Sequence, residues 1–222
     1  MNQSKLFEVQ RKLDERIVKE KGLEGEDLLD KKILALQVEL GELANEWRGF
    51  KFWSEDQKPN NFTANPDDVC EVCKGEPIHF NEDKTKIIGQ CKNCDGVGVH
   101  FHNPLLEEYV DCLHFIISIG NDLEIEQWDY DYTFKDDLME LDNITEQFIM
   151  IIGGARKLYY DIAYKEEMQG DGMVSEFELE FRVWKSYRFI IGPFLSLGKM
   201  LGFTWEQIEQ AYYEKNKINH ER

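Results

Sequence analysis

The chain has 222 residues, 42% of them hydrophobic, and a formal net charge of -18. This length and apolar content can bury one substantial core, so we expect a single domain over residues 1–222. The excess of acids argues against a nucleic-acid backbone or an anionic membrane as a main partner. The N-terminus lacks the apolar core of a signal peptide, and no apolar run reaches the ~18–20 residues that span a bilayer. We therefore expect a cytoplasmic protein whose five cysteines are reduced.

Residues 4–21 predict a first helix, because apolar side chains recur there at three- and four-residue spacing. Gln10 and Asp14 are four residues apart and so share one face of this helix. Taken alone, the pair is best interpreted as polar surface residues.

A second helix is predicted over residues 30–48, with Asp30 as a candidate N-cap. Glu39 and Glu42 are three residues apart and lie beside the apolar face of this helix. Two unpaired carboxylates at the edge of a core are costly, and a divalent cation relieves that cost, because hard oxygen ligands suit magnesium. The alternative is a pair of glutamates on a solvated edge. The apolar face comprises Leu36, Leu40, Leu43, Ala44 and Trp47.

The composition changes after residue 54, where Asn, Asp, Pro and Gly accumulate up to about residue 102. Within this stretch, Cys70 and Cys73 form one Cys-x-x-Cys pair, and Cys91 and Cys94 form another. Four thiolates at this spacing close a tetrahedral structural zinc site, although disulfides remain an alternative. We expect a zinc-ribbon insert over residues 66–102. It has no basic stripe, so a structural role or the docking of a protein regulator is favoured over nucleic-acid binding.

A third helix is predicted over residues 103–120, since Asn103 suits an N-cap and Pro104 the first helical position. Glu108 and Asp111 are again three residues apart, and Asp111 lies in a run that is otherwise apolar enough to be core. Two helices that each offer two acids can pack face to face and hold one or two cations.

The remaining chain is also predicted to be helical, over residues 137–165, over residues 175–201 with a break near Gly192-Pro193, and after Thr204. Thr204 and Gln207 form a capping box. The many aromatic residues between 175 and 201 suggest a subunit interface as well as a core. The last helix presents cations and amides on one face, which fits either a solvated surface or contacts with a triphosphate and a sugar. These residues are Lys215, Asn216, Asn219 and Arg222.

The two acid motifs, Glu-x-x-Glu and later Glu-x-x-Asp, resemble those of the all-α nucleoside triphosphate pyrophosphohydrolase (MazG-like) superfamily. More narrowly, the chain is similar to the dimeric dUTPases, in a form associated with Gram-positive bacteria and their phages. Residues 10–14, 46–53 and 213–222 carry that narrower similarity. The resemblance implies an all-α helix bundle around a metal site, interrupted by the zinc ribbon.

The resemblance also implies an activity, namely hydrolysis of dUTP, and of dUDP as a second substrate, to dUMP by an obligate homodimer. Two or more magnesium ions would be held by Glu39, Glu42, Glu108 and Asp111. Either of the first two glutamates, Glu39 by preference, would orient the attacking water. The substrate would be bound by Gln10, Asp14, Trp53, Lys215, Asn216, Asn219 and Arg222.

Within that set, the expected roles differ. Gln10 would read the uracil edge, because an amide donates and accepts together and matches a base carbonyl and its neighbouring N–H. Trp53 would stack on the base, and the residues of the last helix would hold phosphates and deoxyribose.

Two other functions remain open from the sequence. One is a related pyrophosphohydrolase acting on another pyrimidine nucleotide such as dCTP, because the acid motifs do not choose the base. The other is a partner-binding protein that docks through the ribbon and the aromatic surface. Intact acids at all four positions weigh against binding as the sole role.

Overall fold

A computed structural model describes residues 3–76, 78–80, 87–92, 94, 96, 98–127, 138–165 and 174–221. Over these residues the protein is a helix bundle with two short β-ribbons, which confirms the all-α prediction with a small insert. The helices are α1 (Gln3–Lys21), α2 (Leu29–Trp47), α3 (Pro104–Asp122), the 3-10 helix η1 (Ile125–Gln127), α4 (Ile144–Ala163), α6 (Glu176–Met200) and α7 (Trp205–Glu221). The strands are β1 (Thr63–Val69), β2 (Ile78–Phe80), β3 (Ile87–Gln90) and β4 (Val99–His102).

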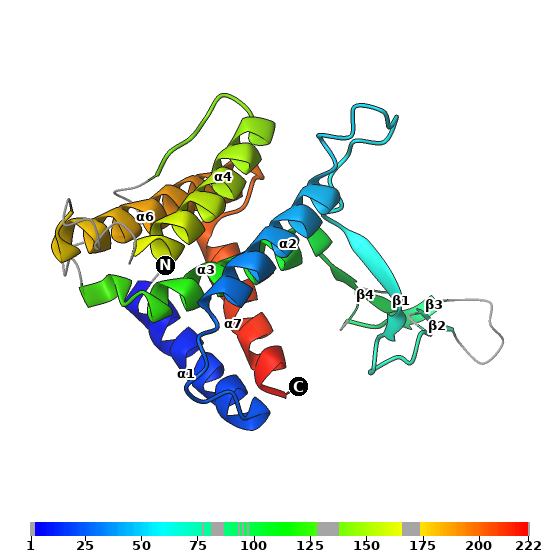
Figure 1. The fold of residues 1–222 in the computed structure, drawn as a ribbon. Helices are drawn as coiled ribbons and strands as arrows, with labels where there is room; N and C mark the ends of the chain where they lie inside the picture. Colours follow the sequence, from blue (N-terminus) through cyan, green and yellow to red (C-terminus); the bar gives the residue numbers. More distant parts are fainter. Residues whose placement is uncertain are drawn as a thin grey trace.

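The helices pack as three pairs (Figure 1). The insert leaves the end of α2 and returns at the start of α3, so these two packed helices run antiparallel. On one side they carry α4 and α6, which pack along each other, and on the other side α1 and α7 contact α3. One buried cluster of apolar residues runs through the six α-helices that the structure describes. None of the helices described is long and apolar enough to cross a bilayer.

The predicted helix starts are confirmed at α3 and α7. Asn103 accepts a hydrogen bond from the Leu106 N–H at 3.0 Å, and Thr204 and Gln207 bond reciprocally. The N-cap assigned to Asp30 is wrong. The helix begins at Leu29, and Leu28 at the cap position makes no side-chain cap bond. Asp30 lies in the first turn, where a negative charge is favourable without capping.

The start of α4 and the break in α6 also differ from the prediction. The helix α4 begins at Ile144, after the cap Asn143, and not near residue 137. Pro193 lies inside an unbroken α6. Proline has no N–H, so the Phe189 carbonyl four residues earlier lacks its helical partner. The helix α4 packs tightly at this point, since a Cβ added to Gly154 would lie 3.0 Å from the Phe189 carbonyl oxygen. Tertiary packing thus outweighs the local cost.

The insert projects away from the helices as two antiparallel ribbons, β1 with β4 and β2 with β3 (Figure 1). Among the described insert residues, the buried side-chain cluster consists of the four cysteines alone. The base of the insert is attached to both neighbouring helices by Asn60. The Asn60 N–H donates to the Glu46 carbonyl at 2.9 Å, and the Asn60 side-chain amide donates to the Glu46 carboxylate at 2.8 Å. The Asn60 carbonyl accepts a hydrogen bond from the Leu105 N–H at 3.1 Å.

Candidate active site

Three of the four predicted acids meet between α2 and α3. Glu39, Glu108 and Asp111 each place a carboxylate oxygen so that all three atoms lie within 4.8 Å of one another. Glu42 is one turn from Glu39 on the same helix, but its side chain is exposed and it is not in this group. Its charge nevertheless raises the pKa of both Glu39 and Glu108.

The acid cluster carries more negative charge than its surroundings neutralise. Burial, and then the charges of Asp111, Glu42 and Glu39, raise the pKa of Glu108 to about 7. Burial and the same kind of repulsion raise the pKa of Glu39. The Oε2 atom of Glu108 is buried without a hydrogen-bond partner among the described residues. An all-oxygen donor set with an orphaned oxygen and excess charge fits a hard divalent cation.

Lys215 of α7 supplies a positive charge at the edge of this cluster. Its Nζ lies 2.7 Å from Asp111 Oδ2 and 2.9 Å from Glu107 Oε1, and its side chain is only 12% exposed. Burial alone would lower the pKa of Lys215, but the two hydrogen-bonded carboxylates raise it, so the ammonium stays charged.

The acid cluster opens into a pocket of about 340 Å³ between α1, α2, α3 and α7. This volume is in the range of small-molecule sites. One part of the wall is apolar, and the rest carries the acids, two lysines and a group of polar side chains. The lining residues are Gln10, Leu13, Asp14, Ile17, Val18, Leu28, Lys32, Glu39, Asp111, His114, Phe115, Ser118, Lys215 and Asn219.

Gln10 and Asp14 lie inside this pocket, and Gln10 is only 4% exposed. The amide nitrogen of Gln10 donates to Asp14 Oδ1 at 2.8 Å, and the Tyr212 hydroxyl donates to Gln10 Oε1 at 2.7 Å. His114 Nδ1 lies 2.6 Å from the same oxygen, while Ser118 Oγ donates to Asp14 Oδ2 at 2.7 Å. The interpretation of the pair as solvated surface residues therefore does not hold.

The other predicted substrate-binding residues are dispersed. Asn219 lines the pocket. Asn216 is buried, with its Nδ2 unpartnered among the described residues, and does not line the pocket. Trp53 is 65% exposed, packs edge-on against Phe50 and Phe52, and also lies outside the pocket wall. Arg222 lies outside the described residues.

His114 and Ser118 were missed from the sequence. The signal was present, since both are polar residues in the apolar run of α3, one and two turns beyond Asp111. From Glu108 to Ser118, α3 therefore aligns acids and hydrogen-bonding groups over about 15 Å at a rise of 1.5 Å per residue.

The four cysteines of the insert form a second candidate metal centre. Cys70 and Cys91 have their sulfurs 3.8 Å apart, Cys73 and Cys94 theirs 3.7 Å apart, and all four ligand atoms lie within 4.8 Å of one another. A tetrahedral zinc ion with Zn–S bonds of 2.3 Å would hold sulfurs about 3.8 Å apart. The geometry therefore fits a closed structural zinc site, and the structure records the cysteines as thiols and not as disulfides.

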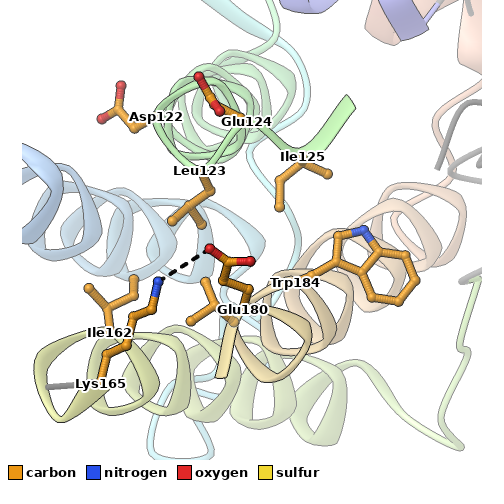
Figure 2. A pocket seen from close by; sticks show the side chains of 9 residues that line it. Asp122, Leu123, Glu124, Ile125, Ile162, Lys165, Glu180 and Trp184 are labelled. Carbon is orange, nitrogen blue, oxygen red and sulfur yellow. Dashed lines mark ion pairs between the residues drawn. The ribbon is translucent and has the colours of Figure 1, made fainter. Parts of the chain in front are cut away.

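A larger cavity, of about 580 Å³, lies elsewhere, where the end of α3 meets α4 and α6. Figure 2 shows Lys165 and Glu180 pairing across it, at 3.6 Å, over an apolar wall that includes Trp184. It contains none of the converging acids of α2 and α3. Size alone therefore does not locate the candidate active site, whereas the clustered carboxylates do.

Comparison with known proteins decides the family. A sequence model described as dUTPase matches residues 2–65 and 100–222. The chain belongs to the dUTPase family. The match confirms the resemblance to the dimeric all-α dUTPases, and with it the assignment as a dUTP diphosphatase. Residues 66–99 of this dUTPase, which hold the four cysteines, fall outside the match. No curated protein and no solved structure matches the chain.

Proposed function

We propose that this dUTPase converts dUTP to dUMP and pyrophosphate in the pocket between α1, α2, α3 and α7, with magnesium at its acid end. The observation that supports the proposal is the convergence of Glu39, Glu108 and Asp111, two of which, Glu39 and Asp111, line a pocket that also contains Gln10. Glu42, one turn along α2, would complete the ligand set for two or more ions.

Magnesium and the chain's own residues would have different roles in the reaction. Magnesium, when bound, supplies positive charge that offsets the charge of the phosphate oxygens. Glu39 would accept a hydrogen bond from the attacking water and take its proton, because it lies in the pocket wall beside Asp111. Glu42 is the alternative base. Lys215 would contact phosphate oxygens as a fixed cation.

The remaining assignments complete the proposed substrate site. Asn219, in the pocket wall, suits the sugar or the phosphates. Asn216 and Arg222 stay proposed contacts on the same terminal helix. Trp53 would need to come from a second subunit or a rearranged segment to stack on the base, because it is exposed away from the pocket.

Pyrophosphate release from a nucleotide panel, with and without magnesium, tests the proposal. We expect turnover of dUTP that requires magnesium, and slower turnover of dUDP with release of phosphate. Turnover of dCTP but not of dUTP would instead identify a relative with another base preference. No turnover of any nucleotide would leave a binding role.

A homodimer and a docking role for the insert belong to the same proposal. Apolar side chains exposed on α4 and α6 offer surface for a second copy, among them Ile149 and Phe177. The insert projects from the helices and lies outside the family match, which favours a role separate from catalysis, such as binding a protein regulator.

A further inference from the structure

Lys215 of α7 lies between two carboxylates of α3 that differ in their place in the site. Its Nζ donates to Asp111 Oδ2 at 2.7 Å and to Glu107 Oε1 at 2.9 Å. Asp111 belongs to the group of three converging acids and lines the pocket, whereas Glu107 does neither. Glu107 is one turn before Asp111 on α3, so the two side chains are neighbours on the helix surface. The ammonium is therefore shared between a candidate metal ligand and a carboxylate outside the ligand set.

This position of Lys215 opposes the binding of a cation at the acid cluster. An ammonium on Asp111 and a divalent cation held by the same carboxylate repel each other, and the repulsion is stronger where water is largely excluded. The side chains of Lys215 and Asp111 are only 12% and 20% exposed, so solvent screens this repulsion poorly. An ammonium fixed on Asp111 alone would thus compete with magnesium for that carboxylate.

Glu107 gives the ammonium of Lys215 a second place to bind. The Glu107 side chain is 48% exposed and already within hydrogen-bond distance of Nζ. Lysine carries a compact charge on a flexible stem, so a small rotation of that stem moves the charge from Asp111 toward Glu107. An ammonium has three hydrogens, and within the described part of the chain these two carboxylates engage two of them. Lys215 can therefore give up Asp111, stay bound to Glu107 and still donate to a phosphate oxygen.

We propose that Glu107 is a positioning residue that draws Lys215 away from Asp111 when magnesium binds, and so raises the affinity of the acid cluster for magnesium. The inference rests on the proposed function, because it takes Asp111 as a magnesium ligand. Glu107 acts through Lys215 and does not itself hold the metal. A carboxylate that acted only through its own charge would favour magnesium whether or not residue 215 was a lysine, and this difference can be measured.

A double-mutant cycle of Glu107→Gln and Lys215→Met tests the proposal, with the Kd for magnesium measured by calorimetry on the nucleotide-free protein. Glutamine keeps the shape of Glu107 without its charge, and methionine keeps an unbranched stem without the ammonium. We expect Glu107→Gln alone to weaken magnesium binding by at least about threefold, a size typical of coupling between contacting residues. Lys215→Met alone should tighten magnesium binding, because it removes the competing cation. In the Lys215→Met background, Glu107→Gln should change the Kd by less than about twofold at physiological salt, which screens an exposed charge.

Glu214→Gln is the matched control, because it removes the same charge from the exposed neighbour of Lys215, whose carboxylate accepts a hydrogen bond from Gln210 instead. It should leave the Kd for magnesium within about twofold of the wild type. An equal effect of Glu107→Gln with and without Lys215 would overturn the inference and leave the proposed function intact, as would an unchanged Kd in both backgrounds. A wild type that binds no magnesium would overturn both.

Discussion

Glu108 is the acid in the cluster with the least compensation, since one of its oxygens is buried without a partner among the described residues. We expect Glu108→Gln to lower kcat/KM for dUTP by about two orders of magnitude or more, because even residues that only support metal ligands are worth 10- to 100-fold. In magnesium-free buffer the variant should melt no lower than the wild type, since it removes repulsion with Asp111 and Glu39.

Asp30→Asn is the control for that experiment, because Asp30 is an exposed acid on α2 well away from the cluster. It should leave turnover within about twofold of the wild type. Full activity of Glu108→Gln would remove this carboxylate from the mechanism. A melting temperature that falls while magnesium affinity is kept would mark Glu108 as structural.

His114 provides a pH-dependent prediction. Its pKa is about 3 in the folded protein, against an ordinary value of 6.5. The unfolded chain therefore binds the proton more readily, and this group's contribution to stability is complete above pH 6.5 and is lost progressively as the pH falls below it. Urea titrations between pH 8 and 5.5 should show a steeper loss of unfolding free energy for the wild type than for His114→Asn. Equal slopes would contradict the prediction.

At the residue scale, the sequence predicted groups that are close along the chain and missed those joined by folding. The three-residue spacing of Glu108 and Asp111, and the Cys-x-x-Cys pairs, are local patterns with a direct chemical meaning. The contact of Gln10 with His114 joins residues 104 positions apart. Polar side chains in an apolar run marked His114 as unusual, but only the packing of α1 against α3 shows what it binds.

Among the elements, the junction between the insert and the helices depends on Asn60. It bonds Glu46, one turn past Glu42, and Leu105, one turn before Glu108. We expect Asn60→Ala to lower the free energy of unfolding by about 1–2 kcal/mol, from the loss of the side-chain bond to a charged carboxylate. It should also weaken magnesium activation, because α2 and α3 carry the facing acids.

Denaturant titration and the magnesium dependence of turnover measure these two effects. Asn61→Ala, at the exposed neighbouring position, should change neither. A stability loss in Asn60→Ala with an unchanged magnesium requirement would limit Asn60 to holding the insert.

We expect the folding of the four-cysteine insert to depend on a bound zinc ion far more than the folding of the helices does. Its described buried side-chain cluster contains only cysteine, so without zinc it has little apolar surface to hold it together. We expect a zinc chelator, or Cys70→Ser, to increase hydrogen exchange over residues 66–102 while the helical circular dichroism persists. Cys112→Ser should keep one zinc per chain, because Cys112 lies in the helical core. Zinc content unaffected by Cys70→Ser would contradict the site.

Helix existence was predictable and helix interruption was not. Capping residues are local, which is why the starts of α3 and α7 were predicted correctly. Pro193 gives an equally local signal for a break, yet α6 continues through it. The Gln147 amide donates to the Pro193 carbonyl at 2.7 Å, and α4 packs closely beside it at Gly154. These contacts come from another helix, so no pattern within α6 contains them.

For the whole molecule, the outer face of α4 is a candidate surface for the proposed homodimer. Ile149, Ile152 and Tyr160 are exposed there at helical spacing, Ile149 by 65%. An isoleucine so exposed contributes little to the monomer's core, so Ile149→Lys should leave the melting of the monomer intact. We expect analytical ultracentrifugation to show a shift from dimer to monomer. Leu34→Lys, at an exposed apolar position of α2, is the control for added charge, and a dimer that survives Ile149→Lys would exclude this face.

The pairing of Thr63 with His102 brings the two ends of the insert side by side. Opposed residues of antiparallel strands have Cα atoms about 4.5–5.5 Å apart, a gap that a tight turn of two residues closes. The insert therefore enters and leaves the helix bundle at a single point. Gene-level loss, gain or exchange of this segment need not disturb the register of α2 against α3, and a shortened chain that keeps Asn60 would retain the catalytic scaffold.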